Sequence, residues 1–98
     1  MAKAYWINIF RSISDPERLQ RYIELAGPAM RSAGGRFRAR GNPAAAFESG
    51  STDRVTLIEF PSVEAAVAAY HSPAYQDALA VLGDAALRDI RIIEEASE

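Results

Sequence analysis

The chain has 98 residues with no cysteine and one histidine. This length predicts a single domain over residues 1–98, and so small a core favours additional burial through oligomerisation. The composition, 49% hydrophobic and 24% charged, is typical of a soluble globular protein rather than a disordered or fibrous one. The formal charge of −2 argues against nucleic-acid binding, because neutralising phosphates requires a concentrated basic excess.

The absence of cysteine and the single histidine exclude several kinds of functional site. Without cysteine the chain has no disulfides, thiolate metal sites or cysteine nucleophiles, and one histidine excludes a histidine-rich metal site. We therefore expect no metal and no other cofactor. The apolar run at residues 5–10 is too short for a signal peptide and for the roughly 20 residues of a membrane span. We expect a cytoplasmic protein without membrane association.

The chain begins with a predicted strand and a predicted helix. Residues 3–10 are dense in aromatic and β-branched side chains, which favours a strand buried on both faces. Ser14 followed by Glu17 predicts a capped helix start, with Pro16 in the first turn. Pro28 predicts an interruption or kink, because proline lacks the N–H that the helix needs. The apolar stripe of this helix comprises Leu19, Tyr22, Ile23, Ala26 and Met30.

Two further strands are expected to pair as a hairpin. Residues 36–41 alternate strictly, which places Arg36, Arg38 and Arg40 on one face of a half-buried strand. Residues 54–60 form a strongly apolar strand, and turn-forming residues separate the two segments. The hairpin would therefore have one arginine-rich face.

The remainder predicts two consecutive helices and a last strand. Ser62 is expected to cap the first of these helices. The sequence His-Ser-Pro then breaks it, and Ser72 and Pro73 restart it. Gly83 ends the second helix, and residues 88–95 form the last strand.

The resulting order is β-α-β-β-α-β, the ferredoxin-like α+β arrangement with an antiparallel sheet of order 4-1-3-2. In this arrangement the helices cover only one face of the sheet. The first strand nevertheless carries Tyr5, Ile7 and Ile9 on one face and Trp6 and Phe10 on the other. An apolar second face must be covered, and we expect a second copy of the chain to cover it.

Six short motifs occur in order along nearly the whole chain: A-Y-W-I at 4–7, D-P at 15–16, G-G-R-F at 34–37, R-G at 40–41, E-F-P-S at 59–62 and Y-H-S-P-A-Y-Q at 70–76. With this set the sequence resembles the domain of unknown function 1330 family, a branch of the dimeric α+β barrel superfamily. The resemblance implies a homodimer whose two sheets pack face to face, with a cleft between helices and sheet in each subunit. Relatives include cofactor-free monooxygenases, isomerases, haem enzymes and stress-induced proteins, so no single reaction is implied.

Two side chains are candidates for acid–base chemistry. His71 is the only imidazole and lies at the helix break between Tyr70 and Tyr75, where a side chain can point into a cleft. The alternative is an exposed residue at a helix joint. Glu59 lies in an apolar strand, where burial would raise its pKa into a useful range. The alternative, which we favour slightly, is a salt bridge to Arg36 or Arg38.

Other side chains are candidates for ligand binding. Trp6 and Asn8 share one face of the first strand and would supply a stacking surface and a directional hydrogen bond. The alternative places Trp6 in the core and bonds Asn8 to a neighbouring group. Tyr22, Tyr70 and Tyr75 could line the same cavity, although packing with their hydroxyls in water is the interpretation that we favour.

The arginines of the hairpin have two interpretations. Arg36, Arg38 and Arg40, with Arg54, could bind a carboxylate. However, residues 1–54 hold nine basic and five acidic side chains, whereas residues 55–98 hold two and eight. We therefore favour cross-subunit ion pairs between this strand and the acidic last strand, with ligand binding by Arg38 as the alternative.

Three functions are consistent with these residues. The first is a homodimer that binds a small organic ligand, apolar or aromatic and in some cases anionic. The second is a cofactor-independent enzyme, monooxygenase-like or isomerase-like, in which His71 or Glu59 removes a proton. The third is a structural or stress-related dimer without a ligand. No phosphate-binding loop, nucleophile elbow or metal-ligand spacing is present.

Overall fold

A computed structural model describes residues 2–97. The elements are β1 (Ala4–Ile13), α1 (Pro16–Ser32), β2 (Arg36–Gly41), β3 (Val55–Phe60), α2 (Val63–His71), α3 (Pro73–Leu82) and β4 (Ala86–Glu94). The strands form one antiparallel sheet in the order β2-β3-β1-β4. This is the predicted order read from the other edge, so the predicted ferredoxin-like fold is confirmed.

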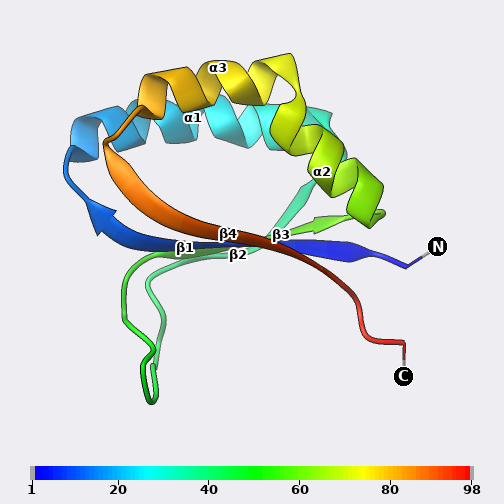
Figure 1. Cartoon of the computed structure of the whole chain (residues 1–98), viewed down its shortest axis with the longest axis horizontal. Helices are drawn as coiled ribbons and strands as arrows, with labels where there is room; N and C mark the ends of the chain where they lie inside the picture. Colours follow the sequence, from blue (N-terminus) through cyan, green and yellow to red (C-terminus); the bar gives the residue numbers. More distant parts are fainter. Residues whose placement is uncertain (1, 98) are drawn as a thin grey trace.

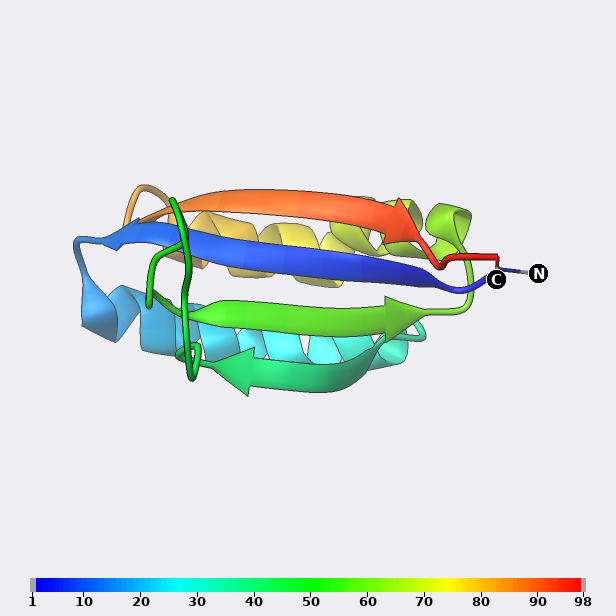
Figure 2. The ribbon, with the colours of Figure 1, turned by 90° about the horizontal axis from the view of Figure 1, so that it is seen from below.

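The molecule has two layers, with all the helices on one face of the sheet (Figure 1). No helix of residues 2–97 covers the opposite face, as the view from below shows (Figure 2). The long connection between β2 and β3, at residues 42–54, projects away from the helices on that open side (Figure 1). Within residues 2–97, no helix combines the length and apolar character needed to cross a bilayer.

Strand β1 lies at the centre of the sheet and separates the two environments. Its burial alternates, with Trp6, Asn8 and Phe10 enclosed beneath the helices and Ile7 and Ile9 half-buried on the open face. The prediction that this strand is apolar on both faces is therefore confirmed. Its helix-facing side chains define the floor on which the core and the candidate site are built.

The start of α1 lies one residue later than predicted. Asp15, not Ser14, is the N-cap, and its side chain accepts a hydrogen bond from the backbone N–H of Arg18. Pro16 occupies the first turn as expected. The Ser14 hydroxyl instead donates to the carbonyl of Ala85, 3.2 Å away. The capping-box prediction was wrong because this serine ties the helix start to the beginning of β4.

Helix α1 also continues through Pro28, where the sequence predicted an interruption. A residue that precedes proline normally avoids the helical conformation, because its Cβ and N–H crowd the proline ring. Gly27 has no Cβ, which removes part of this crowding. The uninterrupted helix keeps Met30 in the core, where it is fully buried.

The predicted caps of the other helices are confirmed. Ser62 accepts a hydrogen bond from the N–H of Ala65, and Ser72 accepts one from the N–H of Tyr75. Gly83 ends α3 with a φ of 51°, a left-handed conformation that favours glycine. Because α3 restarts at Ser72, Tyr75 points into the core and is completely buried.

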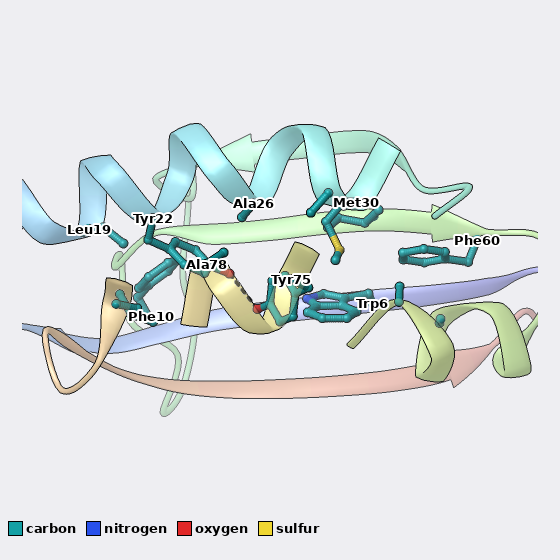
Figure 3. Close-up of a cluster of buried hydrophobic side chains, with 14 of the residues drawn as sticks. Trp6, Phe10, Leu19, Tyr22, Ala26, Met30, Phe60, Tyr75 and Ala78 are labelled. Carbon is teal, nitrogen blue, oxygen red and sulfur yellow. Dashed lines mark hydrogen bonds between the residues drawn. The ribbon is translucent and has the colours of Figure 1, made fainter. Parts of the chain in front are cut away.

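The core fills the space between the helices and the sheet. Its largest fully buried side chains are Trp6, Tyr75, Phe10, Phe60 and Met30. The Trp6 and Tyr75 rings meet edge to face with centroids 5.3 Å apart, and Figure 3 shows them side by side. Such aromatic pairs add about 0.5–1.5 kcal/mol beyond area burial. Trp6 is therefore a core residue that also faces the candidate site.

A β-bulge in β2 changes the predicted distribution of the arginines. The register shifts between Phe37 and Ala39, so Arg36 lies opposite Glu59 whereas Arg40 lies opposite Thr56. Because Thr56 is buried beneath the helices, Arg40 is on the helix side of the sheet. The prediction that all three arginines share a face was wrong, because an extra residue in a bulge reverses the alternation beyond it.

Candidate functional site

Helix α1 and the sheet enclose a pocket with a cavity volume of about 40 Å³. Its walls are mainly apolar and come from both layers: Trp6, Phe10, Ile23, Met30, Phe37 and Ile58. A water molecule needs roughly 10–15 Å³ measured in this way, so the enclosed space accepts a group of a few atoms. The site lies within the cleft between helices and sheet that the resemblance implied.

A polar row crosses the floor of this pocket. Asn8 on β1 pairs with Thr56 on β3, which in turn pairs with Arg40 on the edge strand β2. Asn8 is only 4% exposed, and its Oδ1 forms no hydrogen bond within residues 2–97. A buried carbonyl without a partner costs about 1–3 kcal/mol. The predicted bond from Asn8 to a neighbouring group is absent, which leaves this oxygen available to a molecule in the pocket.

Two arginines line the outer part of the pocket. Arg40 is exposed on the edge strand, with its guanidinium 4.8 Å from the centre of the Phe37 ring. Arg54 precedes β3 and is half-buried. In the part of the chain that the structure describes, neither arginine forms an ion pair, and no carboxylate lines the pocket. The outer end of the site is therefore positively charged.

A tyrosine pair forms the inner wall. The hydroxyls of Tyr22 on α1 and Tyr75 on α3 lie 2.7 Å apart, and Figure 3 shows them meeting across the core. Nη1 of Arg88 donates to both, at 2.8 Å and 3.3 Å. Burial, and then the neighbouring Tyr75, raise the pKa of Tyr22. The packing role that we favoured for Tyr22 and Tyr75 is confirmed, but the expectation that their hydroxyls reach water was wrong, because each hydroxyl finds partners inside the protein.

The two candidate acid–base residues lie outside the pocket. His71 is the last residue of α2 and is exposed, with its ring edge-on to Tyr70 at 5.4 Å. Glu59 faces the open side of the sheet, where its carboxylate pairs with Arg38 at 3.3 Å and with Lys3 at 3.8 Å. The structure therefore brings neither group to the cavity.

The less favoured interpretation of Glu59, in which burial raises its pKa, was wrong. A hydrogen bond from Arg38 lowers the pKa of this carboxyl below its ordinary value of 4.5. The favoured alternative, a salt bridge to Arg38, is confirmed. Arg38 is thereby held on the open face and does not reach the pocket.

Among the remaining candidates, Trp6, Asn8, Tyr22 and Tyr75 are brought together around the pocket. Tyr70 lies elsewhere, in a groove beside β4. The sequence analysis did not identify Thr56 or Arg88 as site residues. Each lies two positions from an apolar residue on the same, helix-facing side of its strand, and that pattern could have identified them. Across residues 2–97 no group of three His, Asp or Glu side chains is placed to hold a metal ion.

Several solved structures share the fold of this chain but have low sequence identity to it. A protein of unknown function from Rhodopseudomonas palustris is 21% identical, with a TM-score of 0.72 over 99% of this chain and 85% of its own. A dimeric ferredoxin-like protein from Jannaschia is 14% identical, with a TM-score of 0.75 over 95% and 99%. SnoaB, a cofactor-independent oxygenase from Streptomyces nogalater, is 11% identical, with a TM-score of 0.70 over 100% and 97%.

The comparison with curated proteins gives no match. The family model for the domain of unknown function DUF1330 matches residues 3–96, nearly the whole chain. The motifs, the strand order and this match agree, and the chain belongs to the DUF1330 family.

Proposed function

We propose that the protein binds a small organic carboxylate, carrying a hydrogen-bond donor, in the pocket between α1 and the sheet. The observation that carries this proposal is the buried Oδ1 of Asn8, which lines the pocket without a hydrogen-bond partner in residues 2–97. A hydroxyl or N–H group of a ligand would satisfy it. The apolar walls favour a ligand whose remaining surface is hydrocarbon.

The charge of the site supports an anionic ligand. Arg40 and Arg54 line the pocket, whereas no carboxylate does. A guanidinium binds a carboxylate with two parallel, charge-assisted hydrogen bonds. Because Asn8 lies on the central strand and Arg40 on the edge strand, the donor would enter first and the carboxylate would stay near the mouth.

Matched ligand pairs test this proposal. Lactate and propionate, or 4-hydroxybenzoate and benzoate, differ only in the hydroxyl that would donate to Asn8. We expect the hydroxylated member of at least one pair to bind more tightly and to shift the NMR signals of the Asn8 side-chain amide. Asn8→Leu should abolish that preference, whereas Asn42→Ala, a change in the exposed loop, should retain it. The proposal is wrong if neither pair shifts the Asn8 amide.

We also infer that two copies of the chain pack sheet against sheet. The open face exposes Leu87 (64% exposed) and Ile93 (57%), beside the half-buried Ile7, Ile9 and Leu57. Large apolar side chains exposed on a sheet face that no helix of residues 2–97 covers indicate an interaction surface. The fold neighbour from Jannaschia, described as dimeric, supports the same arrangement.

The proposed cross-subunit ion pairs now involve fewer residues. Arg40 lies on the helix side, and Arg38 is already paired with Glu59. Asp89 of the last strand is likewise paired, with Arg11 and Arg91. Among the arginines of β2, Arg36 is left as the candidate that could set subunit register.

A cofactor-independent enzyme is the second candidate, favoured by the full-length likeness to the fold of the oxygenase SnoaB. In such an enzyme Asn8 and the tyrosine pair would orient the substrate, since His71 and Glu59 lie away from the pocket. Mass spectrometry separates the two candidates. A ligand recovered unchanged after incubation with the protein in air identifies a binding protein, and an oxygenated or isomerised product identifies an enzyme.

A further inference from the structure

A second concave surface lies on the helix side of the sheet, beside the edge strand β4. It is a groove of about 610 Å³ between β4 and the helices α2 and α3. Side chains from all three elements line it, chiefly Tyr70, Leu79, Leu82, Ile90 and Ile92, with Arg88 as its charged group. The groove is separate from the pocket beneath α1, because the two share no lining residue.

Arg88 is the feature of this groove that indicates a ligand. Its guanidinium is half-buried, yet it has no carboxylate partner within residues 2–97. Burial lowers the pKa of Arg88, but the two tyrosines outweigh this, so the net shift is upward. The side chain is therefore a cation among mainly apolar side chains. The Tyr22 ring, whose centre is 4.9 Å from the guanidinium carbon, compensates this charge in part, but no carboxylate of residues 2–97 does.

The hydrogen bonds of Arg88 use one nitrogen only. Nη1 donates to the hydroxyls of Tyr22 and Tyr75, whereas Nε and Nη2 donate to no residue in the described chain. That Nε–Nη2 edge is one of the two guanidinium edges that can bind a carboxylate in a planar, bidentate manner. Arg91, on the same strand, uses this edge to bind Asp89, with both N–O distances at 3.1 Å.

The apolar lining extends from Arg88 along one direction. Arg88, Ile90 and Ile92 alternate on the helix-facing side of β4, so they follow one another about 7 Å apart. Tyr70 from α2 and Leu79 from α3 lie over this row. The surface thus offers one positive charge at one end and a hydrocarbon-lined track leading from it.

We infer that this groove is a second binding site, for a monoanionic carboxylate with an extended apolar chain. The carboxylate would accept hydrogen bonds from Nε and Nη2 of Arg88, while Nη1 keeps its bonds to the tyrosine pair. The chain would lie along Ile90 and Ile92. One guanidinium and no second cation in the lining favour a single negative charge over a phosphate dianion.

Calorimetry and NMR with three probes test this site. Octanoate carries both charge and chain, 1-octanol carries the chain alone, and acetate carries the charge alone. We expect octanoate to bind with shifts at the amides of β4 and α3, and both other probes to bind at least tenfold more weakly. The inference is overturned if octanoate does not bind at millimolar concentration, or if 1-octanol binds equally well.

Variants locate the binding. Arg88→Gln should weaken octanoate binding about tenfold to a hundredfold, as expected for a lost hydrogen-bonded charge. Arg91→Gln, an exposed arginine on the opposite face of β4, is the matched control and should leave binding unchanged. If Arg88→Gln does not fold, Arg88→Lys keeps the charge but loses the bidentate edge, and should still bind octanoate more weakly.

Octanoate binding in the groove can be distinguished from binding in the pocket beneath α1. Asn8→Leu should leave octanoate binding unchanged, because Asn8 does not line the groove. Octanoate shifts confined to Asn8 and Thr56, or equal binding by wild type and a folded Arg88 variant, would assign the ligand to the other pocket and refute the groove. Failure of the matched hydroxyl pairs at Asn8 would refute the pocket and leave the groove intact.

Discussion

The two faces of the sheet treat their charged residues differently. On the open face the acidic residues are matched within the chain, where Glu59 contacts Lys3 and Arg38, and Asp89 contacts Arg11 and Arg91. On the helix face the arginines of the two concave sites have no acidic partner in residues 2–97; these are Arg40, Arg54 and Arg88.

The two faces of the sheet therefore differ in what they favour. Exposed ion pairs contribute little to stability, about 0–1 kcal/mol each. They do, however, leave neither Glu59 nor Asp89 as an unpaired carboxylate on a face that also exposes Leu87 and Ile93, and so lower the cost of burying that face against a second copy. On the helix face, by contrast, the guanidiniums of the two concave sites have no carboxylate partner in residues 2–97, so they favour the binding of an anion. The contrast supports the proposed association surface on one side of the sheet and the proposed binding sites on the other.

The largest predicted effect concerns the open face. Leu57→Asp places an unpaired carboxylate in the proposed interface, and symmetry places two in each dimer. We expect the dimer dissociation constant to rise more than a hundredfold in sedimentation measurements. Leu25→Asp, on the exposed side of α1, is the matched control and should leave the dimer intact. A wild-type protein that is monomeric at high micromolar concentration would contradict the interface.

On the helix face, the tyrosine pair offers the next largest effect. Tyr75→Phe removes one member of a buried hydrogen-bond network and should lower the free energy of unfolding by about 1–2 kcal/mol. Tyr5→Phe, on the open face, is the matched control with little expected change. Urea denaturation of both variants measures this difference. If Tyr75→Phe and Tyr5→Phe lower the free energy of unfolding equally, the hydrogen bonds of the tyrosine pair do not contribute to stability.

Asn8→Leu has an effect of opposite sign. The substitution replaces an amide whose oxygen has no partner by an apolar group of similar size, so the ligand-free protein should become more stable by about 1 kcal/mol. The free energy of unfolding measured without ligand checks this. A loss of stability would mean that the Asn8 amide is satisfied in the free protein.

The smallest expected effect is a pH dependence of the folding stability, which arises from ion pairs on the open face. Hydrogen bonds from Arg38 lower the pKa of Glu59, and those from Arg91 and then Arg11 lower the pKa of Asp89. A lowered pKa stabilises the fold above the ordinary values of 4.5 and 3.8, and this contribution is lost as pH falls through the lower values of the folded state.

Urea midpoints between pH 6 and pH 2 should therefore decline more steeply for the wild type than for Glu59→Gln. The same comparison in high salt should reduce the difference, because exposed pairs are screened. Identical pH profiles for the two proteins would show that the Glu59 pair adds nothing to stability.

Much of the fold could be predicted because it depends on local pattern. The two-faced apolar β1, the caps at Ser62 and Ser72 and the end of α3 at Gly83 follow from neighbouring residues alone. The errors arose where distant contacts intervene. Ser14 bonds to Ala85 across the fold instead of capping α1, and the bulge in β2 moves Arg40 to the helix side.

The candidate site was only partly predictable for the same reason. Alternation along β1 places Trp6 and Asn8 on one face, and both line the pocket. The bond between Tyr22 and Tyr75 joins residues 53 positions apart, and the bond from Arg88 to Tyr22 joins residues 66 apart. No local spacing reveals such contacts.

The proposal at Asn8 is that its Oδ1 accepts a hydrogen bond from the hydroxyl or N–H group of a bound organic carboxylate. A thermodynamic cycle tests it most directly, combining wild type and Asn8→Leu with a hydroxylated carboxylate and its matched partner without the hydroxyl. We predict that the hydroxyl improves affinity for the wild type about tenfold, near 1.4 kcal/mol, and that this advantage disappears in Asn8→Leu. An equal advantage in both proteins, or none in either, would show that Asn8 does not accept this hydrogen bond.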